Sequence, residues 1–143
     1  MLNIGRGAVA AEMVGLSEEV FGRTVTYLKE RKQFGKLIGE FQSLQHRAAH
    51  LYSEIEIARA AAFKAAQLID SGDDKAELIT SVAKAKAAVV ASLAVREGVQ
   101  MHGGIGMTDE HDIGLFMKRA AVLGEVFGDV YFHRARVAEL SGY

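Results

Sequence analysis

Two short stretches of the chain combine phosphate-binding side chains with glycines that let a backbone turn. Residues 31–35 read Arg-Lys-Gln-Phe-Gly, and a guanidinium can make paired hydrogen bonds to a phosphate while keeping its charge. Residues 100–106 read Gln-Met-His-Gly-Gly-Ile-Gly, and the amides of exposed glycines can donate to phosphate oxygens or ring acceptors. Each stretch alone is more often an ordinary helix end followed by a turn.

A metal site is a competing hypothesis. His46, His50 and Glu54 follow one another at four-residue spacing, so they would share one face of a helix. Two histidines at that spacing can ligate a metal, but a di-iron bundle needs Glu-x-x-His motifs on two helices, and the sequence has none. We therefore predict a polar surface stripe and no metal. His102 is expected in a turn, and His133 on a solvated or interfacial face.

Long helices are predicted to position these residues. Apolar side chains recur at helical spacing in three segments, at about 3–32, 40–71 and 75–101. Gly35 and Gly39 are expected to stop the first of these helices. The residues expected on the buried stripes are Val9, Met13, Leu16, Val20, Val25, Leu28, Leu44, Ala48, Leu51, Ile55, Ile57, Ala61, Ala65, Leu78, Val82, Ala85, Val89, Leu93 and Val95.

The remainder of the chain is less regular. A short helix or turn is expected over 108–119, and a final helix beginning near 123–129 and ending at about 140. Proline is absent, so no helix interior meets an obligatory break, and no segment alternates with the period of a strand. The sequence therefore predicts an all-α, up-and-down four-helix bundle in one domain.

Composition narrows the function classes. The chain has 143 residues and a net charge of −1, from 17 basic and 18 acidic side chains. This balance gives no electrostatic reason to expect nucleic acid or an anionic membrane as partner. There is no cysteine, no secretory signal pattern, and no uncharged apolar run of about 18 residues. A cytoplasmic protein is the expectation.

Taken together and in order, the motifs resemble the C-terminal domain of the acyl-CoA dehydrogenase family. The matching residues are Tyr27, 31–35, Phe41–Gln42 and 100–106, and the resemblance covers essentially the whole chain. It implies a four-helix domain that binds FAD, in an oxidoreductase that converts acyl-CoA thioesters to enoyl-CoA during fatty acid or steroid side-chain β-oxidation. The family's N-terminal helical and middle β domains have no counterpart in these 143 residues.

The resemblance also implies roles for single residues. Arg31 would contact the FAD pyrophosphate, and Arg6 would lie near the acyl-CoA substrate. Gln33, Phe34 and Gln42 would line the adenosine side of the pocket. Gln100, Gly103 and Gly104 would meet the FAD of a partner subunit.

No catalytic base is assigned. Counted forward from the glycine turn, the family's Glu-Gly-Thr triplet falls on Phe127-Gly128-Asp129, and its alternative base position falls on Gly5. Neither phenylalanine nor glycine can accept a proton, and Glu125 or Asp129 would be poor substitutes. The resemblance then implies a non-catalytic subunit in a homo- or hetero-oligomer, where a related subunit supplies the glutamate. The alternative is a cofactor-free interaction domain that uses the alanine-rich third helix, Tyr131 and Phe132.

Overall fold

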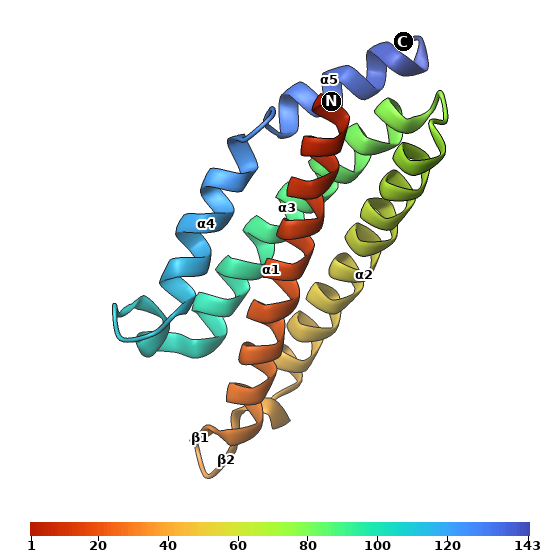
Figure 1. Cartoon of the computed structure of the whole chain (residues 1–143). Coiled ribbons are helices and arrows are strands. Elements are labelled where there is room, and N and C mark those ends of the chain that lie inside the picture. The colour runs from red at the N-terminus through yellow and green to blue at the C-terminus, as the bar shows by residue number, and fades with distance from the viewer.

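Helices account for almost the whole chain in the computed structural model, which describes residues 1–143 (Figure 1). Figure 1 shows the helices running alternately up and down, with the last helix, which leads to the C-terminus, lying across the end that holds the N-terminus. The predicted all-α class is confirmed. The five helices are α1 (Leu2–Glu30), α2 (Gln42–Ser71), α3 (Ala76–His102), α4 (Ile113–Glu125) and α5 (Val130–Ser141).

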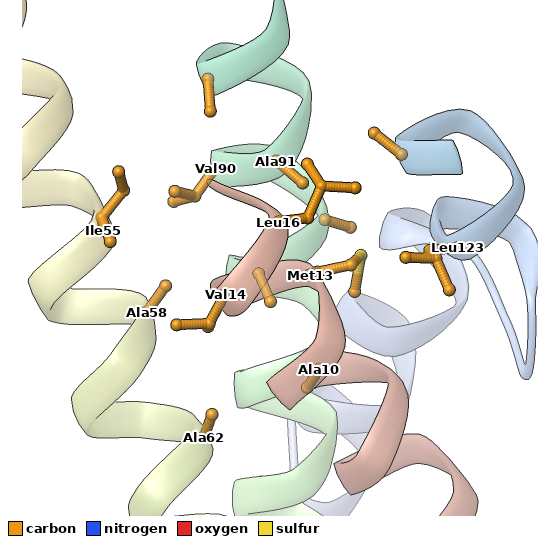
Figure 2. Close-up of a cluster of buried hydrophobic side chains, with 14 of the residues drawn as sticks. Ala10, Met13, Val14, Leu16, Ile55, Ala58, Ala62, Val90, Ala91 and Leu123 are labelled. Atoms are coloured by element: carbon orange, nitrogen blue, oxygen red, sulfur yellow. The ribbon is translucent and has the colours of Figure 1, made fainter. Parts of the chain in front are cut away.

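Helix α3 is the centre of the bundle, and it contacts α1, α2, α4 and α5. Its alanines are small, which lets neighbouring helices approach on several sides. Figure 2 shows side chains of α1, α2 and α4 meeting there, including Leu16, Ile55 and Leu123. By length and composition alone α3 could cross a membrane, but most of its apolar stretch is buried inside the bundle.

The predicted stripes are largely correct, with three exceptions. Met13, Val20, Leu51 and Ile55 are among the core residues that are fully or almost fully buried. Ile57 is exposed because it lies two residues from Ile55, on nearly the opposite side of α2. Val82 and Val89 are also partly exposed. They are seven residues apart, so they share an outward face of α3 beside α5.

The end of the first helix differs from the prediction. Helix α1 ends at Glu30, before either glycine, and the chain forms a small hairpin of β1 (Lys32–Gln33) and β2 (Lys36–Leu37). Phe34 and Gly35 form its turn with φ angles of 54° and 79°. A two-residue hairpin turn of this kind needs positive φ at both positions, which explains the glycine. A 3-10 turn, Ile38–Glu40, then leads into α2.

The last two helices also begin later than predicted. A 3-10 turn, Gly103–Met107, follows α3, and α4 begins only at Ile113. Helix α5 begins at Val130, where Asp129 caps it by accepting a hydrogen bond of 2.7 Å from the amide of Phe132. The start therefore lies at the far edge of the expected range 123–129, because Phe127 and Gly128 have φ angles of 61° and 110°, which no helix accommodates.

A first prediction concerns the contact between α1 and α3. A Cβ atom on Gly98 would lie 2.8 Å from Cγ1 of Val20. We expect Gly98→Val to lower the free energy of unfolding by about 2 kcal/mol, because α1 must move to admit the new side chain. Chemical denaturation measures this, with Gly22→Ala as control because nothing lies within 4 Å of a Cβ there. Equal midpoints for Gly98→Val and wild type would contradict the close packing.

Candidate functional site

The two motif stretches meet in one pocket at the hairpin end of the bundle. Five of the predicted residues line it together: Arg31, Gln33, Gln100, Gly103 and Gly104. Tyr27, Ile38, Leu44, Met101, His102 and Ile105 complete the wall. The pocket has a volume of about 480 Å³, within the usual range for small-molecule and cofactor sites.

Backbone hydrogen bonds bring Arg31 and Gln33 to this pocket. The amide of Arg31 donates to the carbonyl of Tyr27 over 2.9 Å and ends α1. The amide of Ile38 then donates to the carbonyl of Arg31 over 2.8 Å, which folds the hairpin back. The guanidinium of Arg31 is exposed and makes no ion pair or hydrogen bond within the chain. It is therefore free to bind an anionic ligand.

The opposite wall comes from the end of α3. Gly103 ends this helix with φ 66° and ψ −142°, a conformation that glycine adopts readily. Gly103 and Gly104 are both exposed, and nothing lies within 4 Å of a Cβ at either position. A ligand can therefore approach this stretch of backbone closely.

Two aromatic residues that motif reasoning left without a role form part of the wall. The rings of Tyr27 and His102 lie 4.6 Å apart, and His102 also lies 4.4 Å from His111. His102 is buried as the last residue of α3, so the expectation of a turn residue is wrong. Its Nδ1 lies 2.7 Å from the carbonyl of Gly98, and burial lowers its pKa. Tyr27 belongs to the matched motif but was given no role there, and it reaches the wall because it precedes Arg31 by one helical turn.

Phe34 and Gln42 are not brought to the pocket. Phe34 is 90% exposed at the hairpin turn, with its ring 6.2 Å from that of Phe41. Gln42 is the exposed first residue of α2. Any ligand contact by these two residues must therefore come from outside the pocket.

The positions matched to the family's two bases form a second feature, at the other end of the bundle (Figure 1). The ring of Phe127 lies against α1, and a Cβ atom on Gly5 would lie 2.9 Å from its Cε2. Residues 5 and 127 are therefore in contact, so the two positions matched to the family's bases lie at the same point of the structure. Arg6 lies beside them, where its Nε approaches the carbonyl of Phe127 at 3.4 Å and its guanidinium lies 5.3 Å from the centre of the Phe132 ring.

Two carboxylates near this position, Glu125 and Asp129, line a second pocket together. Glu125 is the exposed last residue of α4. Asp129 uses a carboxylate oxygen to cap α5. Two basic side chains, Lys84 and His133, are fully buried on the interior side of the loop between α4 and α5. The expectation that His133 is solvated or interfacial is therefore wrong.

The metal hypothesis gains no support from the geometry. No three histidine, aspartate or glutamate side chains lie together as ligands for an ion. Oε2 of Glu54 lies 2.6 Å from Nζ of Lys86, and this hydrogen bond lowers the pKa of Glu54. The stripe is therefore part of an ordinary ion-paired surface.

The chain is thus a helical bundle domain with a pocket of about 480 Å³ between Arg31 and the glycine turn. The family model described as "Acyl-CoA dehydrogenase, C-terminal domain" matches residues 1–141. The chain belongs to the acyl-CoA dehydrogenase family, a family of flavoprotein oxidoreductases, and corresponds to its C-terminal domain.

Individual relatives agree with this assignment. Acyl-CoA dehydrogenase IpdE2 of Mycobacterium tuberculosis is 44% identical over 112 residues, which cover 78% of this chain and 33% of that protein. The structure of butyryl-CoA dehydrogenase from Megasphaera elsdenii superposes with a TM-score of 0.94 at 31% identity, covering 98% of this chain and 36% of that one. The Tcur3481-Tcur3483 steroid acyl-CoA dehydrogenase superposes with a TM-score of 0.92 at 30% identity, covering 98% and 38%. The chain thus spans about a third of the length of these relatives.

Proposed function

We propose that this chain is the FAD-binding and oligomer-forming part of an acyl-CoA dehydrogenase and that it lacks a catalytic glutamate of its own. In the assembled enzyme it takes part in α,β-dehydrogenation of acyl-CoA thioesters. The observation that carries the proposal is the pocket in which an unpaired Arg31 faces the glycine turn 103–104.

The residues of the pocket fit a dinucleotide. Arg31 would hold the pyrophosphate through charge-assisted hydrogen bonds, and the open backbone at Gly103 and Gly104 admits phosphate oxygens at close range. The side-chain amides of Gln33 and Gln100 supply donors and acceptors for the adenosine side. Bound FAD would supply the hydride acceptor of the reaction.

The position of the missing base supports a non-catalytic role. Abstraction of the α-proton needs a carboxylate close to the α-carbon. At the point where residues 5 and 127 touch, the chain has a glycine and an aromatic ring, and neither position carries a carboxylate. Another subunit must then supply the base. The similar steroid acyl-CoA dehydrogenase, which carries two component names, is consistent with a paired assembly.

The distance between the two features also supports assembly. Gly5 and Arg31 are separated by nearly the whole of α1, which at 1.5 Å per residue is about 40 Å. The pocket and the α4–α5 loop of one chain therefore contribute to different ligands or to distant parts of the complex. An oligomer with another acyl-CoA dehydrogenase subunit brings each of them to a complete site.

Flavin content tests this function. We expect the complex purified with its partner subunit to be yellow and to form enoyl-CoA from an acyl-CoA. Arg31→Ala should weaken FAD retention about 10- to 100-fold, because a hydrogen bond to a charged group contributes about 1.5–3 kcal/mol. Lys32→Ala is the matched control, since Lys32 is also an exposed cation but does not line the pocket.

Titration of the apo complex with FAD measures both affinities. A complex that assembles normally without flavin would contradict the proposal and favour a cofactor-free interaction domain. Equal FAD affinity in Arg31→Ala and Lys32→Ala would remove Arg31 from the site.

A further inference from the structure

A fully buried lysine holds the loop between α4 and α5 from inside the bundle. Nζ of Lys84, on α3, donates to the carbonyls of Gly124 and Gly128 over 3.1 and 3.0 Å. Gly124 lies in the last turn of α4, where carbonyls have no partner within the helix and the helix dipole is negative. Lys84 therefore satisfies the end of α4 and fixes the loop that follows it.

A fully buried histidine lies on the other side of the same loop. His133 is 0% exposed, and neither of its ring nitrogens makes a hydrogen bond. Its Nε2 would lie 3.1 Å from a Cβ on Gly128, which places the ring directly against the loop. Burial, then Lys84 and Arg6, lower the pKa of His133 to about 4, although the carbonyl of Phe127 and the carboxylate of Asp129 favour protonation slightly. The imidazole is therefore neutral at physiological pH.

The groups around this histidine are mostly cationic or already paired. Arg6 of α1 reaches the carbonyl of Phe127, and Lys84 of α3 holds the carbonyls on either side. Among the nearby carboxylates, Glu77 of α3 is paired with Arg136 of α5 at 2.7 Å and lies 4.0 Å from Arg6. Asp129 caps α5, and Glu125 of α4 is exposed. A proton added to His133 would thus meet two cations, the buried Lys84 and the partly buried Arg6, while the Asp129 carboxylate favours it only weakly.

We propose that Lys84 and His133 are positioning residues for the loop 126–129: Lys84 holds the loop against the bundle, and protonation of His133 releases it. We call this pair of residues the proton-operated clamp. With neutral His133 the loop stays on Lys84 and keeps Phe127 against Gly5. Protonation of His133 adds a third cation beside Lys84 and Arg6, and the loop leaves α1. Phe127 has a positive φ of 61°, a strained conformation for a residue with a side chain, and opening would release that strain. The clamp requires neither FAD nor a partner subunit, so it stands independently of the proposed function.

The direction of the pH effect follows from His133. Its pKa is lower in the closed state than the usual 6.5, so the open state binds more protons between pH 6.5 and about 4. Closure is therefore fully favoured above pH 6.5 and weakens as the pH falls. We expect the opening constant to rise on the order of 100-fold over this range. Hydrogen exchange of the amides at 126–132 in the full chain, corrected for intrinsic rates, measures it.

Substitutions separate the proton-operated clamp from ordinary packing. His133→Gln should remove the pH dependence of loop opening, whereas His46→Gln, at an exposed position, should retain it. Lys84→Met should raise loop exchange at neutral pH, because the bonds from Lys84 to two backbone carbonyls are lost. It should also reduce the rise in opening between pH 6.5 and about 4, because protonated His133 then meets one cation fewer in the closed state. If Lys84→Met does not fold, Arg6→Gln should reduce the rise in the same way.

A purely structural role for these side chains would leave the size of the pH dependence unchanged. Identical pH profiles for His133→Gln and wild type would overturn the proposal. An equally large rise in opening for Lys84→Met and wild type, or for Arg6→Gln and wild type where that variant replaces it, would overturn it as well.

Discussion

Replacing Phe127 with glutamate is expected to raise the rate of acyl-CoA dehydrogenation roughly 10²- to 10⁴-fold at the active site formed with this loop, the usual contribution of a positioned general base. The assay uses the FAD-loaded complex in which the partner subunit's own catalytic glutamate is replaced by glutamine. We expect this gain because residue 127 lies against Gly5 and beside Arg6, where both positions matched to the family's bases meet. Enoyl-CoA formation with an artificial electron acceptor measures the gain.

Phe127→Gln is the matched control for this gain. It has nearly the same shape as the glutamate variant but cannot accept a proton, so it should stay at background. A misplacement of about 1 Å can cost on the order of 100-fold, so the lower end of the expected range applies if the loop shifts. Wild type turning over as fast as Phe127→Glu would contradict the assignment of a missing base. Equal rates for the two variants would contradict it too.

Gly128→Val is expected to lower the free energy of unfolding by about 4 kcal/mol, from backbone strain and overpacking together. Gly128 has a φ of 110°, which side-chain-bearing residues rarely adopt. A Cβ there would collide with the ring of Phe132 and lie 3.1 Å from Nε2 of His133. The bond from Lys84 to the Gly128 carbonyl would be lost when the loop moves. Denaturant unfolding of the full chain gives the difference.

A neighbouring glycine supplies the control for this effect. Gly124 lies within α4 with nothing within 4 Å of a Cβ, so Gly124→Ala should be neutral or stabilising by up to about 1 kcal/mol. An insoluble or unfolded Gly128→Val protein agrees with the prediction. Unfolding of both variants at the wild-type denaturant concentration would show that the loop tolerates a side chain.

Helical periodicity predicted the bundle well because α1, α2 and α3 are long and carry no proline. It could not predict the hairpin at 32–37, since two-residue strands have no period to detect. The start of α5 was predicted only to within 123–129 for a related reason. Apolar residues recur on both sides of Gly124 and Glu125, and only the backbone angles at Phe127 and Gly128 show where one helix stops and the next begins.

Parts of the candidate site could be predicted and parts could not. The motifs singled out residues 31–33 and 100–104, but the resemblance assigned Gln100, Gly103 and Gly104 to the FAD of a partner subunit, whereas one pocket of a single chain holds both stretches. The buried basic groups were missed because the partners of Lys84 are backbone carbonyls, which no residue type in the sequence identifies. The position of Lys84 on its helix did indicate that it is buried. It lies at helical spacing from Ala87, Ala88 and Ala91, on the buried face of α3, where an unpaired charge is costly.

The central position of α3 determines when the chain can fold during synthesis. Helices α1 and α2 rest on α3 as well as on each other, and α5 packs chiefly on α3. The first 75 residues alone would leave the apolar stripes of two helices facing water, and isolated helices gain most of their stability from packing. Helices α1 and α2 of a nascent chain therefore remain accessible to proteases and chaperones until residues 76–102 emerge from the ribosome. Both helices can then bury their apolar stripes against α3.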